Sequence, residues 1–203
     1  MRKFMNSEQS GRSMVEMLGV LAIIGVLSVG GISGYSKAMA KFKMSKAMDQ
    51  MSMLVANIRT TYASMATYNG LDTTAARNYG LASRDMFGTA ANSLVNAFGG
   101  EVYVKAIPNP NSGVADTGFA IVYNGLDKEA CMGLATADWG SAGLIGISIS
   151  NAKVNAEPQA VAQGYITTAN MPVSLATAAG AGNNAANACS SNTAVNSISW
   201  YYY

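Results

Sequence analysis

The most informative absence in this sequence of 203 residues is histidine, which does not occur at all. Histidine is the commonest general base in enzymes and the commonest metal ligand, so both kinds of chemistry lose their usual residue. A hydrolase would need a lysine or carboxylate base instead, and no motif supplies one. The acidic residues of the second half are scattered and lack the spacing of a calcium-binding loop. We therefore predict a protein that is not an enzyme and that has no cofactor or metal site.

Charge is also scarce, because only 12% of the residues are charged and the net charge is +2. This balance does not indicate a nucleic-acid partner, which would call for a strongly basic surface. Half of the residues are hydrophobic. A chain of this length and composition is long enough for one moderate domain with additional segments.

Cysteine is limited to Cys131 and Cys189, which lie far apart and lack the paired spacing of a zinc site. If this half of the chain is exported, the two residues are expected to form a disulfide. Such a bond would stabilise the fold by roughly 4 kcal/mol on the chain-entropy model. Two buried free thiols are the alternative.

One apolar run, from Met14 to Gly34, has 21 residues and contains a single charge, Glu16. As a helix it would be about 31 Å long at roughly 1.5 Å per residue, which matches the hydrocarbon core of a bilayer. Five glycines lie within it, and small residues of this kind permit close approach of helices in lipid. We expect the run to pack tightly against other helices, with a bend or unwinding near Gly30–Gly34.

Glu16 requires an explanation, because a charge in a membrane segment costs about 2.5–3.5 kcal/mol on insertion scales. A secretory signal peptide would be cut after Ala40, but Lys37 precedes that site and the helical pattern continues through it. A plain membrane anchor would use Glu16 in a capping box with Ser13. The anchor leaves Gly11 unexplained.

Four lysines, Lys37, Lys41, Lys43 and Lys46, follow the apolar run. Basic residues also precede it, so the positive-inside rule does not settle its orientation. We interpret the four lysines as a face exposed to solvent or to lipid headgroups.

A short basic leader (MRKFMNSEQS), a glycine, a carboxylate five residues after it and a continuous apolar helix together resemble the type IV pilin signature. The resemblance is closest to the type IVb branch and its thin-pilus relatives. It implies that a prepilin peptidase cuts between Gly11 and Arg12. It also implies that Glu16 neutralises the freed terminal amine of a neighbouring subunit, because a charge in a helical bundle needs an opposite charge nearby. Arg12 and Glu16 are then the candidate assembly residues.

The sequence departs from the family pattern in two ways. Its mature chain would start at Arg12 rather than at an apolar residue, which leaves N-methylation open, and the helix-bending proline of the type IVa branch is absent. The implied partners are further copies of the chain, the prepilin peptidase, the inner-membrane assembly machinery and membrane lipid before assembly. The implied location is the inner membrane first and an extracellular pilus filament afterwards. A pseudopilin of a secretion system and an anchored or secreted adhesin that never polymerises are alternative functions.

Beyond Lys43 the apolar residues follow spacings of four and three that are typical of one helix face. This face consists of Met44, Met48, Met51, Val55, Ile58, Tyr62 and Met65. We expect one helix from about Ser13 to Tyr68, ended by a turn at Asn69-Gly70. Its second half should pack on the domain's own sheet, and a coiled-coil seam is the alternative.

After Gly99-Gly100 the pattern changes to the alternation of strands. Strands are predicted at Glu101–Ile107, Gly118–Tyr123, Gly143–Ser150 and Asn196–Tyr203. Asn124-Gly125 is expected to turn the chain, and Asp127 is expected to cap a helix carrying Cys131. A short helix is expected near residues 83–87.

The predicted fold class is α+β, with a long N-terminal helix packed on an antiparallel sheet. The expected parts are a leader (1–11), the helix (12–68, transmembrane at about 14–34) and a globular domain (69–203). The resemblance implies a disulfide-bounded C-terminal region. In the last strand Ile198, Trp200 and Tyr202 share one face, and we expect this aromatic end to pack in the core rather than bind a sugar.

Overall fold

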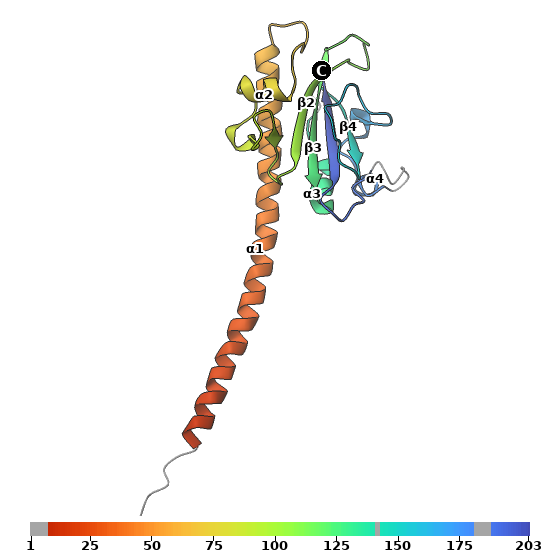
Figure 1. Ribbon diagram of the computed structural model, residues 1–203. Helices are drawn as coiled ribbons and strands as arrows, with labels where there is room; N and C mark the ends of the chain where they lie inside the picture. Colours follow the sequence, from red (N-terminus) through yellow and green to blue (C-terminus); the bar gives the residue numbers. More distant parts are fainter. Residues whose placement is uncertain (1–7, 141–142, 181–187) are drawn as a thin grey trace, which may run out of the picture. The chain divides into compact units, whose positions relative to one another are not determined.

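The computed structural model describes residues 8–140, 143–180 and 188–203, with side chains from Met14 onwards in these ranges. Its elements follow in the order α1 (Glu8–Tyr62), α2 (Thr73–Asn78), η1 (Arg84–Met86), β1 (Leu94–Val95), β2 (Glu101–Ile107), β3 (Gly118–Leu126), α3 (Lys128–Thr136), β4 (Leu144–Ser150), β5 (Ile166–Thr167), η2 (Thr168–Asn170), α4 (Leu175–Ala178) and β6 (Asn196–Tyr202) (Figure 1). The chain forms two compact units, of which the first ends at Phe42 and the second begins at Lys43.

The first unit contains the N-terminal part of α1. The backbone is already helical at Glu8, so Ser13 lies inside the helix and not at the N-cap position that the capping box of the plain-anchor alternative requires. The helix also continues through the five glycines, and the unwinding expected near Gly30–Gly34 is not present. The hydroxyls of Ser28 and Ser36 donate to the carbonyls of Ile24 and Ile32 at 2.7 and 3.0 Å, which satisfies both hydroxyls within the helix.

Helix α1 ends at Tyr62, six residues before the predicted end at Tyr68. The chain turns after Tyr62, and the Tyr68 backbone N–H donates to the Asp116 carbonyl at 2.6 Å. The ring of Tyr68 then lies 5.6 Å from Tyr62 and 4.8 Å from Phe119, measured between centroids. A continuous helix would place positions 62 and 68 on different faces, so the helix ends where two tyrosines can share one aromatic cluster.

The second half of α1 packs on the domain's own sheet, as predicted, but through a face rotated from the predicted one. Its buried apolar residues are Ala47, Met51, Leu54, Ile58 and Tyr62. Met48 and Val55 lie at the edge of the core, while Met65 is exposed beyond the helix end. The predicted face contains only large side chains, whereas the observed face begins with a small buried alanine, Ala47.

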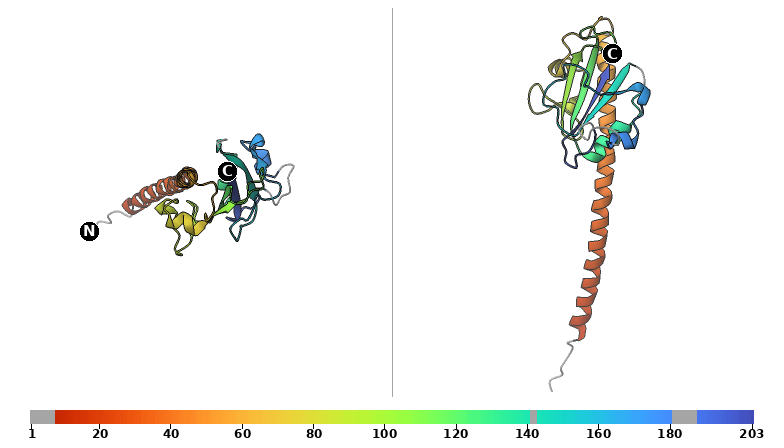
Figure 2. Two further views of the ribbon diagram at one scale, coloured as in Figure 1. Left: turned by 90° about the horizontal axis from the view of Figure 1, so that it is seen from above. Right: turned by 90° about the vertical axis from the view of Figure 1, so that its right-hand side faces the viewer.

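The sheet has six strands in the order β1-β2-β3-β6-β4-β5, and every pairing is antiparallel. β6 is last in the sequence, yet it lies between β3 and β4, as the blue strand in the right-hand view of Figure 2 shows. The predicted strands at Glu101–Ile107 and Asn196–Tyr203 are confirmed to within one residue, and β4 begins one residue later than predicted.

The predicted turn at Asn124-Gly125 is wrong, because β3 continues through this pair to Leu126. Gly125 has a φ of +71°, and the register with β6 shifts between Tyr123 and Leu126. The side chain of Asn124 accepts a hydrogen bond from the Val154 backbone at 2.8 Å. The pair therefore forms a bulge within the strand, a conformation that Gly permits as readily as a turn.

The aromatic end of the chain packs in the core, as predicted. Ile198, Trp200 and Tyr202 all join the main hydrophobic cluster beneath α1. Trp200 lies edge-on to Tyr123 at 5.3 Å, and Tyr202 stacks on Phe119 at 5.3 Å. Tyr201 alternates to the opposite face of the sheet, where a smaller cluster surrounds it.

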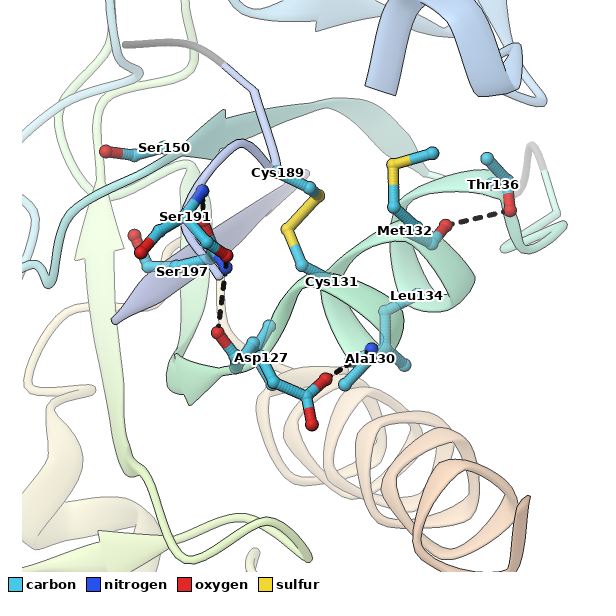
Figure 3. The surroundings of a disulfide bond; sticks show 12 residues. Asp127, Ala130, Cys131, Met132, Leu134, Thr136, Ser150, Cys189, Ser191 and Ser197 are labelled. Atoms are coloured by element: carbon cyan, nitrogen blue, oxygen red, sulfur yellow. Dashed lines mark hydrogen bonds between the residues drawn. A yellow bond between two sulfur atoms is a disulfide. The ribbon is translucent and has the colours of Figure 1, made fainter. Parts of the chain in front are cut away.

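The structure contains the predicted disulfide between Cys131 and Cys189, both of which are fully buried. Cys131 lies on α3, which begins where the Asp127 carboxylate accepts a hydrogen bond from the Ala130 backbone at 2.7 Å, as Figure 3 shows. Cys189 precedes β6, and its N–H donates to the Ala178 carbonyl at 2.9 Å. The bond thus joins α3 to the segment that leads into the central strand.

Candidate functional site

The apolar half of α1 is a large exposed hydrophobic surface. Every side chain from Met14 to Ala38 is exposed, and the large apolar ones range from 52% exposed at Ile24 to 75% at Val26. The helix is long and apolar enough to cross a membrane. A soluble monomer rarely exposes a surface of this kind unless it contacts lipid or another protein. This segment is therefore the candidate functional site.

The glycines leave open space on this surface. A Cβ atom added at Gly19, Gly25, Gly30, Gly31 or Gly34 would meet no other atom within 4 Å. Gly30 and Gly34 are four residues apart, so they lie one above the other on the same helix face. This small-xxx-small spacing permits a second helix to approach the backbone closely.

Glu16 is the single charged residue between Met14 and Ser36, and its side chain is exposed on the helix. Gly11 and Arg12 lie in the same helix, with Arg12 one turn before Glu16. Residues 1–7 of the predicted leader, and the side chain of Arg12, are outside the described part of the protein. Cleavage at Gly11 and charge pairing by Arg12 and Glu16 therefore stay predictions.

A polar cluster that the sequence analysis missed fastens η1 to α1 in the second unit. Asp85 accepts hydrogen bonds from Ser83 at 2.5 Å and from the amide of Gln50 at 2.8 Å, and its carboxylate lies 2.9 Å from the Lys46 ammonium. The Ser83 hydrogen bond, followed by that from Lys46, lowers the pKa of Asp85 to about 2. Gln50 is not one of the apolar residues of the predicted face, yet it is buried where its amide donates to this carboxylate. The four residues together are called the Asp85 cluster.

A groove of about 450 Å³ runs along the second half of α1. It is lined by Ser52, Val55, Ala56, Arg59, Thr60, Trp139 and Tyr202. The Arg59 guanidinium lies 5.3 Å from the centroid of the Tyr202 ring and donates to the Tyr203 carbonyl at 3.3 Å. The Trp139 indole donates to the Leu134 carbonyl at 2.8 Å. The Arg59 guanidinium and the Trp139 indole of this groove thus both take part in contacts within the domain.

Other charged groups of the second unit join loops to the sheet. Glu157 pairs with the Lys105 ammonium at 3.3 Å and accepts a hydrogen bond from the Thr73 backbone at 3.0 Å. Within residues 8–140, 143–180 and 188–203, no three Cys, Asp or Glu side chains gather into a group that could hold a metal ion.

Similarity to known proteins extends over most of the chain. Residues 41–201 match the family model described as PilS N terminal. The major structural subunit of the bundle-forming pilus from Escherichia coli O127:H6 is 29% identical over 179 residues, which cover 87% of this chain and 91% of that protein. The toxin coregulated pilin of Vibrio cholerae is 26% identical over 143 residues, with 67% of this chain and 63% of that protein covered.

Two solved structures are also similar. The crystal structure of TcpA, a type IV pilin from Vibrio cholerae El Tor biotype, has a TM-score of 0.47 and 18% identity, covering 79% of this chain and 99% of that chain. The structure of the type IV b pilin from Salmonella typhi has a TM-score of 0.48 and 20% identity, with 78% and 98% covered.

Proposed function

The chain belongs to the PilS N-terminal family of type IVb pilins, and on this premise we propose that it is a structural subunit of a type IV pilus that polymerises through the apolar half of α1. The observation that carries the proposal is the exposure of every side chain from Met14 to Gly34. Burying one large apolar side chain stabilises by about 1.5–3 kcal/mol, so a run of this length strongly favours lipid or neighbouring helices over water. Membrane lipid would cover it before assembly and other subunits afterwards.

The proposed maturation step is cleavage by a prepilin peptidase between Gly11 and Arg12. Helix α1 would then begin at Arg12, and Glu16 would lie in the second turn. A free terminal amine at Arg12 would add a positive charge at the start of the helix. Pairing of that amine with Glu16 of a neighbouring subunit would remove the cost of leaving either charge alone among apolar helices.

The proposed route begins in the inner membrane and ends in an extracellular filament, with the assembly machinery as a transient partner. The role is structural rather than enzymatic. The relatives' names describe subunits of pili, which supports this role over a pseudopilin or a non-polymerising adhesin.

The first test is the intact mass of the protein extracted from membranes. A chain that begins at Arg12, with or without one methyl group, would support the processing step. A chain that begins at Lys41 would indicate a signal peptide, and one that retains Met1 would indicate a plain anchor. Either of these two results would contradict the proposal.

The second test replaces Glu16. Glu16→Gln removes the charge but keeps the size, so the monomer should remain folded and inserted while the filament yield falls more than about tenfold, because a neighbour's buried amine loses its partner. Sheared filaments per cell, counted by electron microscopy and gel, measure the effect. Asp49→Asn is the control, since Asp49 is an exposed carboxylate of the same helix. A normal filament yield from Glu16→Gln would exclude the charge pairing.

A further inference from the structure

Two aromatic residues and two lysines follow the apolar run on α1 within eight residues. Tyr35 and Phe42 are 68% and 61% exposed, and Lys37 and Lys41 are exposed as well. Lys37 is the first charged residue after Glu16. These four residues, all within the first compact unit, are called the collar.

The collar surrounds the helix with two kinds of side chain. Lys37 and Lys41 are four residues apart, so their ammonium groups lie on one face. Tyr35 and Phe42 are seven residues apart, which places both rings on another face. Among the residues that the structure describes, ion pairs are formed by Lys46 and Lys105 but not by Lys37 or Lys41. The next acid along the helix, Asp49, is two turns beyond Lys41.

The position of the collar along α1 corresponds to the surface of a membrane. If Met14–Gly34 spans the hydrocarbon core, Lys37 lies about 4–5 Å beyond the core and Lys41 about 10 Å, at roughly 1.5 Å per residue. The headgroup layer on each side is about 5–7 Å thick. Helical side chains point toward the N-terminus of their helix, which at this point is the direction of the membrane. The long stem of Lys41 therefore brings its ammonium back toward the layer that Lys37 occupies.

We propose that the collar binds the phosphate groups of anionic phospholipids at the outer surface of the membrane that holds the subunit before assembly. This inference rests on the membrane-inserted stage of the proposed function. A lysine ammonium has three hydrogen-bond donors and acts as a point charge toward phosphate. Tyrosine is enriched at the level of the headgroups, and an aromatic ring beside it fills the boundary between chains and headgroups. The collar fixes the depth of α1 in the bilayer and concentrates anionic lipid around the subunit before assembly.

The experiment titrates phosphatidylglycerol into the full chain reconstituted in phosphatidylcholine vesicles and measures retained lipid by native mass spectrometry. Lys37→Gln/Lys41→Gln is the test variant. With about 1 kcal/mol for each lysine near the surface, its affinity for phosphatidylglycerol should be roughly thirtyfold weaker at low salt. The difference should shrink as salt is added, because the contact lies at the water interface. Lys37→Arg/Lys41→Arg should bind as the parent chain does.

Lys128→Gln/Lys153→Gln is the matched control, because it removes two exposed lysines of the second unit and the same total charge. Equal loss in the control and test variants would overturn the proposal, as would a test variant within twofold of the parent chain. Displacement of the lipid by inorganic phosphate, beyond that caused by chloride at equal ionic strength, would assign the lysines to free phosphate instead. A chain that fails to float with the vesicles would also overturn the proposal. None of these measurements requires leader cleavage or filament formation. A failure of the lipid-binding proposal is therefore distinguishable from a failure of the proposed polymerisation.

Discussion

Asp85 shows how one side chain can fasten a loop to a helix 35 residues away. It receives hydrogen bonds from Ser83 and Gln50 and an ion pair from Lys46, and its own side chain is 41% exposed. Because water screens an ion pair this exposed, the whole cluster is worth about 1 kcal/mol or less to the free energy of unfolding. Its role is to position η1, which carries the buried Met86, against α1.

Asp85→Asn should change how stability depends on pH. The pKa of Asp85 is lowered from 3.8 to about 2 in the folded protein. A carboxylate with a lowered pKa stabilises the fold above its unfolded pKa, and that stabilisation is lost as the pH falls from about 4 to 2. We expect the free energy of unfolding, measured by denaturant on the full chain in micelles at several pH values, to fall less between about pH 4 and pH 2 in Asp85→Asn than in the parent chain. Glu129→Gln replaces an exposed carboxylate and is the control. Its free energy of unfolding should fall with pH as that of the parent chain does. An equal fall in Asp85→Asn would show that Asp85 does not cause the difference.

At the scale of elements, the sequence predicts those whose pattern has a single interpretation. β2 and β6 alternate over seven residues each, and α3 follows an Asp cap, so all three were predicted. The Asn124-Gly125 pair suits a turn or a bulge equally well, and only the pairing of β3 with β6 selects the bulge. The two-residue strands β1 and β5 are too short to show any period.

The disulfide is the strongest single constraint between elements. Its two residues are 58 apart in the sequence, so removing the bond should lower the free energy of unfolding by about 4 kcal/mol on the chain-entropy model. Denaturant unfolding of Cys131→Ser/Cys189→Ser should show this loss, and the parent chain with reductant should behave alike. A loss below about 1 kcal/mol in both would mean that the C-terminal segment is held by its other contacts.

At the scale of the whole molecule, the candidate site could be predicted because it is continuous in the sequence. The apolar run, its glycines and Glu16 all lie on one helix, and the length of the run alone predicts that helix. In the Asp85 cluster, Gln50 and Asp85 are 35 positions apart in the sequence. In the groove along α1, Arg59 and Tyr203 are 144 positions apart. No local pattern brings such residues together, so only the folded chain reveals them.

Gly30→Leu/Gly34→Leu should separate the folding of the subunit from its assembly. A Cβ atom added at either glycine meets nothing within 4 Å in the monomer, and replacing glycine within a helix favours the helix by roughly 0.5–1 kcal/mol at each site. Helix content by circular dichroism should therefore stay or rise, while the filament yield falls because two helices no longer approach closely. Val29→Leu enlarges a neighbouring side chain without removing a glycine and should assemble normally. An undiminished yield from the double variant would show that this face is not a helix contact.

Because β6 lies at the centre of the sheet, we expect the sheet to be completed only when this late segment of the chain has been made. β3 and β4 are joined in the sheet through β6 alone among the described strands, so a domain that crosses the membrane after its N-terminal helix has been inserted holds two unjoined half-sheets until residues 196–202 arrive. Those half-sheets expose unpaired strand edges, and incompletely folded chains are bound by chaperones and degraded by proteases. A truncated chain would thus be removed before it could join, and block, a growing fibre. Pulse–chase of a chain that stops before Asn196 would show this as rapid degradation, and a stable truncated chain would contradict this expectation.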